Sequence, residues 1–144
     1  MNRIKIELPD QFHFSTEIKI RITDLNYGGH VGNDVFLALI HEARQQFLMK
    51  HGYGELSFAG VGLIMADVAL EYKKELNHGD LIRISVCAAD FDKLGFDLFY
   101  KLEVLQSDGP VLAGKAKTGM ICYDYTAKKK TAVPEDAIQK LLSH

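Results

Sequence analysis

Hydrophobic and polar residues alternate along most of this chain, but one segment repeats with the period of a helix. In residues 16–22 isoleucines stand at 18, 20 and 22, and charged residues stand at 17, 19 and 21. Residues 3–8 show the same pattern. A period of two residues is typical of a strand with one buried face. We therefore expect both segments to be strands of an antiparallel sheet.

The helical period covers residues 33–51. Phe36, Ile40, Ala43 and Phe47 recur there at helical spacing, and Gly52 follows as a stop signal. The pattern predicts a helix of about five turns. Its first half is apolar on every side, which is typical of a helix that is covered all round. We expect strands to wrap it.

More alternating segments follow the helix, separated by the turn sequences "NHGD", "DKLG" and "SDGP". These segments are residues 62–76, 80–91, 95–105 and 111–125. A short helix is expected from Pro134, because proline is tolerated in a first helical turn. The order of elements predicts an α+β fold, in which an antiparallel sheet of about five to six strands wraps one long central helix. At 144 residues, we expect a single domain over residues 1–144.

Composition and charge narrow the function classes. A formal net charge of -2 argues against nucleic acid as a partner. No apolar run is long enough for a membrane span, and the first ten residues contain no apolar signal core. The cysteines, Cys87 and Cys122, lack metal-site or redox spacing and are expected to be buried thiols. We expect a cytoplasmic protein without membrane contact.

Most of the polar chemistry stands in "DLNYGGHVGNDVF", residues 24–36, where the alternating pattern gives way to the helix. Turn chemistry explains Gly, Asn and Asp here. It does not explain a histidine between Gly29 and Val31. Together with "HEAR" at 41–44 and "LEYKKELNHGD" at 70–80, this segment resembles the hotdog-fold thioesterases of the 4-hydroxybenzoyl-CoA thioesterase type. The resemblance implies a hotdog fold and an acyl-CoA thioesterase.

Thioester hydrolysis needs hydrogen-bond donors for the carbonyl oxygen, and the start of a helix provides unpaired N–H groups. Residues 32–35, which include Asn33 and Asp34, are the expected donors, with Asn33 as the N-cap. Gly28, Gly29 and Gly32 would let an acyl-pantetheine arm approach the main chain. They are equally well explained as residues that only make the turn.

The resemblance also selects catalytic candidates. One branch of the family has a carboxylate, proposed as nucleophile or base, where this chain has Asn26, which can only hold water or the carbonyl by hydrogen bonds. Another branch, with the plant acyl-carrier-protein thioesterases, has an Asp and then an Asn two residues on, like Asp24 and Asn26. Asp24 either activates water or steadies the turn. His30 either accepts a proton or is a hydrogen-bonding strut.

Three charged residues outside this segment are further candidates. Glu42, on the helix, either is a general base or pairs with Arg44 or His41. Asp67 either is an acid supplied across a dimer interface, as this fold often arranges, or faces outward. Lys93, in "FDKLG", is a candidate for binding coenzyme A. No compact metal-ligand spacing joins the candidates, so we expect no metal, and no cofactor apart from coenzyme A as part of the substrate.

The expected function is hydrolysis of acyl thioesters of coenzyme A or acyl carrier protein to the free acid and thiol. Two alternatives remain open. One is a hotdog-fold hydratase or dehydratase acting on acyl thioesters, and the other is a non-catalytic protein that binds acyl ligands. Long edge strands favour pairing with a second copy, and proteins of this fold usually form dimers that often pair again. We therefore expect a homodimer or homotetramer.

Overall fold

The computed structural model describes residues 1–143, so the last residue of the expected domain, His144, lies outside the described residues. Two helices and six strands form the framework, with the 3-10 turn η1 (Ile22–Asp24) before the first helix. They are β1 (Phe14–Lys19), α1 (Asn33–Lys50), β2 (Gly62–Tyr72), β3 (Leu81–Ala89), β4 (Gly95–Gln106), β5 (Gly109–Asp124), β6 (Lys129–Lys130) and α2 (Glu135–Leu142).

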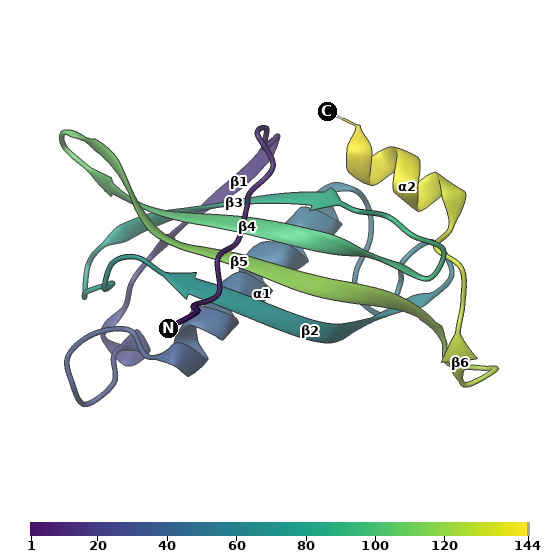
Figure 1. Ribbon diagram of the computed structural model, residues 1–144, viewed down its shortest axis with the longest axis horizontal. Helices are drawn as coiled ribbons and strands as arrows, with labels where there is room; N and C mark the ends of the chain where they lie inside the picture. Colours follow the sequence, from purple (N-terminus) through teal and green to yellow (C-terminus); the bar gives the residue numbers. More distant parts are fainter. Residues whose placement is uncertain (144) are drawn as a thin grey trace.

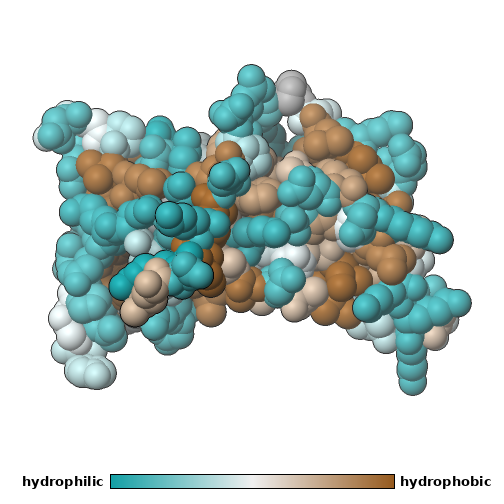
Figure 2. All heavy atoms as spheres, in the orientation of Figure 1, coloured by the Kyte–Doolittle hydropathy of each residue, from teal (hydrophilic) through white to brown (hydrophobic). Residues whose placement is uncertain are grey.

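The strands form one antiparallel sheet in the order β1-β3-β4-β5-β2, with β6 paired to β5. Figure 1 shows α1 lying across one face of this sheet. The other face carries ion pairs such as Arg83 with Glu103 and Lys117 with Asp97, and polar and apolar side chains are interspersed over it in Figure 2. The expected α+β hotdog arrangement is confirmed.

The helix period is also confirmed, because Phe36, Ile40, Ala43 and Phe47 are all buried against the sheet. The expectation that the first half of α1 is covered all round is wrong. Leu37 keeps 39% of its surface exposed. The reason is geometric: one sheet covers only one side of a helix, and nothing among residues 1–143 covers the other.

The N-terminal segment differs from its prediction, since residues 3–8 form no strand. They cross the outer face of the sheet over several strands (Figure 1). The N–H of Ile6 donates to Glu71 Oε1 (2.9 Å), and its carbonyl accepts from Lys115 Nζ (3.3 Å). A segment that crosses the strands cannot align with any of them to form a ladder, so side chains satisfy its main chain instead.

Candidate active site

The loop between η1 and α1 is held together by its own main chain. The N–H of Asn26 donates to the carbonyl of His30 (2.9 Å), and the N–H of Gly29 donates to the carbonyl of Asn26 (3.1 Å). Asn26 Oδ1 accepts from the N–H of Gly28 (2.8 Å). Gly29 has a φ of 83°, which favours glycine. Because Oδ1 of Asn26 is used inside the loop, its Nδ2 amide is the group left to bind a ligand.

The start of α1 has no side-chain cap. Gly32 is the N-cap residue, with extended φ and ψ of -81° and 171°, so the expectation that Asn33 is the N-cap is wrong. Asn33 is instead the first helical residue. The first i to i−4 bond of this helix runs from the N–H of Phe36 to the carbonyl of Gly32 (3.1 Å). The N–H groups of residues 33–35 therefore have no acceptor within the helix.

Gly32 also brings the Asn26 amide to the helix start. A Cβ added at Gly32 would lie 3.0 Å from Asp34 Oδ1 and 3.3 Å from Asn26 Nδ2. Both distances are tighter than ordinary contacts, so a larger residue would push the amide away from the unpaired N–H groups. This close approach gives Gly32 a purpose beyond making a turn.

A cavity of about 500 Å³ lies against this helix start. It is lined by Asn26, His30, Val31, Gly32, Asn33, Phe36, Tyr72, Lys73, Lys74 and Glu75. The last four come from the end of β2 and the residues after it, and the N–H of Val31 donates to the carbonyl of Leu76 (3.0 Å) to join the two segments. The sequence did not predict these four as residues of the site. The feature that could have indicated them is the charged run of Lys73, Lys74 and Glu75, which ends the alternating pattern after Tyr72.

Of the catalytic candidates, Asn26 and His30 line this cavity, and Asp24 does not. Asp24 is only 5% exposed and is bound by Arg21, whose N–H donates to Oδ2 (2.8 Å) and whose Nη2 lies 3.1 Å from Oδ1. The side-chain hydrogen bond from Arg21 lowers the pKa of Asp24. The contacts of Asp24 are those of a residue that steadies the turn η1.

Glu42 and Asp67 also lie away from the cavity. Glu42 is exposed and accepts from Gln46 Nε2 (2.7 Å). Its expected pairing with Arg44 or His41 is wrong, because both of these lie against Glu55 instead, at 3.0 and 3.1 Å. Asp67 is exposed on β2 and accepts from the N–H of Gly119 (3.0 Å) at an irregularity in the pairing of β2 with β5.

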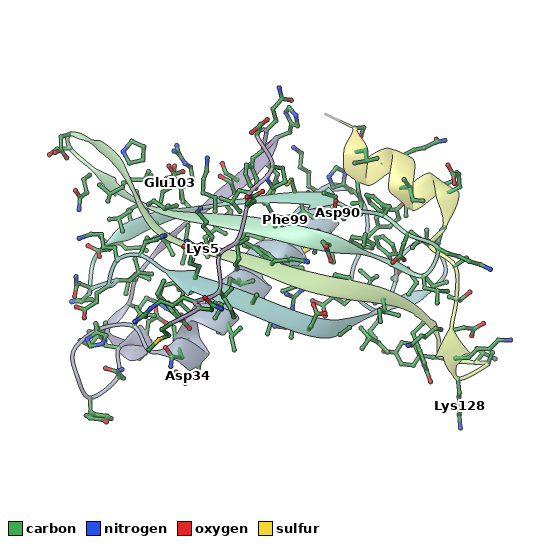
Figure 3. The ribbon with its side chains drawn as sticks, viewed as in Figure 1. Lys5, Asp34, Asp90, Phe99, Glu103 and Lys128 are labelled. Carbon is green, nitrogen blue, oxygen red and sulfur yellow. The ribbon has the colours of Figure 1, made fainter. Side chains whose placement is uncertain are left out.

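The candidate binding residues divide in the same way. Of the candidates in the loop and the helix start, Gly32 and Asn33 line the cavity, whereas Gly28, Gly29 and Asp34 do not. Lys93 belongs to the turn between β3 and β4, where its carbonyl accepts from the N–H of Val133 (2.9 Å). Figure 1 places this turn at the end of the sheet away from the start of α1, and Asp34 and Asp90 are well separated in Figure 3. One chain does not bring Lys93 to the cavity.

A buried polar network in the middle of α1 was not foreseen. Arg44 is 6% exposed, and its Nε and Nη1 donate to Glu55 Oε1 (3.0 Å) and Tyr100 Oη (3.3 Å). Tyr100 Oη and Thr118 Oγ1 are 2.8 Å apart. Burial raises the pKa of the Tyr100 phenol. The network holds a charge inside the fold by giving it partners on a loop and two strands.

Neither helix within residues 1–143 has the length and apolarity of a membrane span. In the same residues no group of three or more His, Cys, Asp and Glu side chains is placed to hold a metal ion. The absence of a bound metal or cofactor from the working protein stays a prediction.

A sheet wrapped on one long helix, with a cavity at the uncapped start of that helix, places this chain among hotdog-fold proteins. The chain belongs to the thioesterase-like superfamily, whose family model matches residues 20–141. It is 27% identical over 119 residues to a 1,4-dihydroxy-2-naphthoyl-CoA hydrolase of Microcystis aeruginosa, covering 81% of this chain and 83% of the relative.

Solved structures show the same fold at low identity. A 1,4-dihydroxy-2-naphthoyl-CoA thioesterase from Synechocystis has a TM-score of 0.76 at 19% identity, covering 91% of this chain and 98% of its own. The 4-hydroxybenzoyl-CoA thioesterase from Pseudomonas sp. strain CBS-3 has a TM-score of 0.77 at 16% identity, covering 88% and 97%. The resemblance noted in the sequence is confirmed.

Proposed function

We propose that this chain hydrolyses acyl-CoA thioesters in the cavity between the start of α1 and the end of β2. The observation that carries the proposal is the uncapped start of α1, which faces a cavity that also holds Asn26 and His30. Membership of the thioesterase-like superfamily supports it. So does the curated relative, whose name describes the hydrolysis of a CoA thioester.

The geometry suggests how the carbonyl is handled. When water adds to the thioester carbon, the carbonyl oxygen becomes negatively charged. The N–H groups of residues 33–35 and Nδ2 of Asn26 are the donors that would stabilise this charge, helped by the positive end of the helix dipole. Asn26 therefore acts as a donor, which fits the absence of a carboxylate at its position.

His30 is the proposed base. Neutral imidazole accepts a proton from the attacking water, and the imidazolium returns it to the departing thiolate when the carbon–sulfur bond breaks. Glu75 provides a carboxylate on the wall of the same cavity. The contacts of Asp24 with Arg21 and the distant positions of Glu42 and Asp67 favour His30 within one chain.

We also propose a homodimer formed through β2. This strand pairs only with β5 among the described strands, and it is an edge of the sheet. Ile64, Met65 and Val68 are exposed on it, and Met65 lines a shallow cavity together with the exposed Leu37 of α1. An exposed apolar edge favours pairing with a second copy. In such a dimer Asp67 would lie at the interface, where its expected role in the partner's site remains a proposal, as does a homotetramer.

The proposal also covers the second substrate class, the cellular location and the cofactor. An acyl carrier protein thioester is a second possible substrate, because the cavity is defined around the thioester and not around the nucleotide of coenzyme A. A cytoplasmic location is supported by the two cysteines, which are free thiols. The reaction as proposed needs no metal and no cofactor apart from coenzyme A as part of the substrate.

Thiol release from a panel of aliphatic and aromatic acyl-CoA substrates tests the proposal. We expect turnover on at least one substrate and strongly reduced turnover for His30→Ala. The matched control is His78→Ala, because His78 is exposed and does not line the cavity. Binding without thiol release by the folded protein would favour the acyl-ligand binder. Hydration of an enoyl-CoA, measured as a loss of the absorbance of the enoyl thioester, would favour the hydratase.

A further inference from the structure

A second cavity, of about 350 Å³, lies at the other end of α1 and shares no lining residue with the candidate active site. The N-terminal segment, the start of β1, β3, the last turn of α1 and the end of α2 enclose it. Its lining includes Phe14, Phe47, Val86, Ala88 and Leu141 as apolar residues and Lys50 as a cation. None of the chemistry proposed above uses this space.

The cavity exists because two neighbouring strands differ in length. The ladder between β1 and β3 ends where Phe14 pairs with Val86, whereas β3 continues to Ala89 against β4. Cys87 and Ala88 therefore have no β1 residue beside them, and both have small side chains. The space left at this edge is closed on one side by Leu141 of α2, which is buried.

The interior is apolar and aromatic. The rings of Phe14 and Phe47 meet edge to face at 5.7 Å, and those of Phe47 and His51 at 5.0 Å. Burial of apolar surface favours an apolar ligand in such a space. A volume of about 350 Å³ lies near the lower end of the ~300–1,000 Å³ that is usual for ligand pockets, so the fitting ligand is small.

The charged residues that line this cavity are one cation, Lys50, and one acid, Asp10. Lys50 Nζ lies 5.6 Å from the centre of the Phe14 ring and donates to the carbonyl of His13 (3.5 Å). Within the part of the chain that the structure describes, no carboxylate lies within ion-pair distance of Lys50. Burial, and then the charges of Lys50 and Lys140, lower the pKa of His51, so a second ammonium group acts on this end of the cavity although Lys140 does not line it.

We propose that this cavity binds a medium-chain fatty acid, with its alkyl chain between Phe47, Ala88 and Leu141 and its carboxylate at Lys50. The apolar walls select the chain, and the ammonium group at the rim selects the charged head. The site does not rest on the proposed hydrolase activity, since it shares no residue with the cavity at the start of α1.

Calorimetric titration with decanoate, and with decanol as its uncharged counterpart, tests the site. We expect one decanoate per chain and weaker binding of decanol. Lys50→Gln should weaken decanoate about three- to fivefold, as expected for one exposed ion pair, and leave decanol unchanged. The control Lys129→Gln makes the same charge change on the exposed strand β6 and should bind like the unchanged protein. Ala88→Leu should fill the cavity and abolish binding of both ligands.

A second measurement places the ligand. Cys87 lines the cavity and is half-buried, whereas Cys122 is fully buried, so decanoate should slow alkylation of Cys87. Equal affinity of decanoate for Lys50→Gln and the unchanged protein would overturn the proposal. Because Lys50 is exposed, we expect this variant to fold like the unchanged protein. Competition of decanoate with an acyl-CoA substrate would assign the binding to the other cavity. Affinity that falls as protein concentration rises would assign the space to a second copy of the chain.

Discussion

The two ends of α1 are built in opposite ways. At its start Gly32 supplies no capping side chain, and the N–H groups of residues 33–35 have no acceptor within the helix; Gly32 and Asn33 line the cavity there. At its end the chain satisfies its own carbonyls: the N–H groups of His51 and Tyr53 donate to Leu48, at 3.0 and 2.8 Å, and that of Gly52 donates to Met49 at 2.9 Å. Only the start of α1 therefore offers unpaired main-chain groups to a reacting substrate.

The largest expected effect comes from Asn26. Asn26→Ala removes the amide donor beside the uncapped helix start, and removal of one such donor typically lowers kcat by about 10²–10³-fold. We expect this loss in steady-state thiol release, with a thermal unfolding midpoint close to that of the unchanged protein. Asn26→Asp keeps an acceptor for the N–H of Gly28 and lacks the donor, but it also introduces the carboxylate that one branch of the family has at this position. Loss of turnover in this variant would support donation by Asn26, and a gain would show that a carboxylate can replace it. Unchanged turnover in the alanine variant would disprove the role given to this residue.

Gly32→Ala tests the close approach at the same end. The new Cβ would stand 3.0 Å from Asp34 Oδ1 and 3.3 Å from Asn26 Nδ2, so the amide must shift away from the helix start. We expect kcat/KM to fall about tenfold, because small displacements of positioning groups are costly. Gly54→Ala is the control, since its Cβ would have only an ordinary contact at 3.9 Å with Gln45. A similar loss in both variants would contradict the special role of Gly32.

Gly52→Ala probes the closed end. Gly52 has a φ of 84°, a conformation that an L-residue adopts at a cost of roughly 1 kcal/mol. We expect the free energy of unfolding in urea to fall by about that amount, while kcat stays unchanged. A loss of turnover without a loss of stability would show that the two ends of the helix are not as separate as the structure indicates.

The smallest effect concerns Asp24, just before the open end. The hydrogen bond from Arg21 lowers the pKa of the folded carboxyl, so its contribution to stability is present above the unfolded pKa and is lost as pH falls through the folded one. Below pH 4, Asp24→Asn should therefore flatten the acid loss of unfolding free energy, by less than about 1 kcal/mol. Chemical denaturation at several pH values measures this. At neutral pH we expect turnover to persist, which would not hold if Asp24 activated water.

Periodicity predicted the helices and strands whose conformation depends mainly on their own sequence and little on contacts with distant segments. The helix over residues 33–51 and the alternating segments after it were identified because their own apolar spacing decides which face is buried. Residues 3–8 alternate just as well, but a strand also needs a partner aligned with it. The direction in which this segment crosses the sheet is set by Glu71 and Lys115, far along the chain. No local pattern contains that information.

The candidate site was predictable where it is contiguous. Asn26, His30 and Gly32 stand in one loop, and unusual composition marked them. Lys73, Lys74 and Glu75 reach the cavity because Val31 bonds to Leu76, a pairing between distant segments. The partner of Arg44 was missed for a similar reason, since Glu55 lies in a loop whose path follows from the packing of Phe58 and not from its own pattern.

The N-terminal segment across the sheet has a mechanical consequence. Its main chain is anchored at Ile6 by two bonds to side chains, and the next element, β1, is an edge strand that pairs only with β3 among the described strands. A force applied to the N-terminus would first detach this segment from the sheet, because two hydrogen bonds to side chains hold its main chain at Ile6. It would then reach the six paired residues of β1, where the hydrogen bonds to β3 begin to resist the pull.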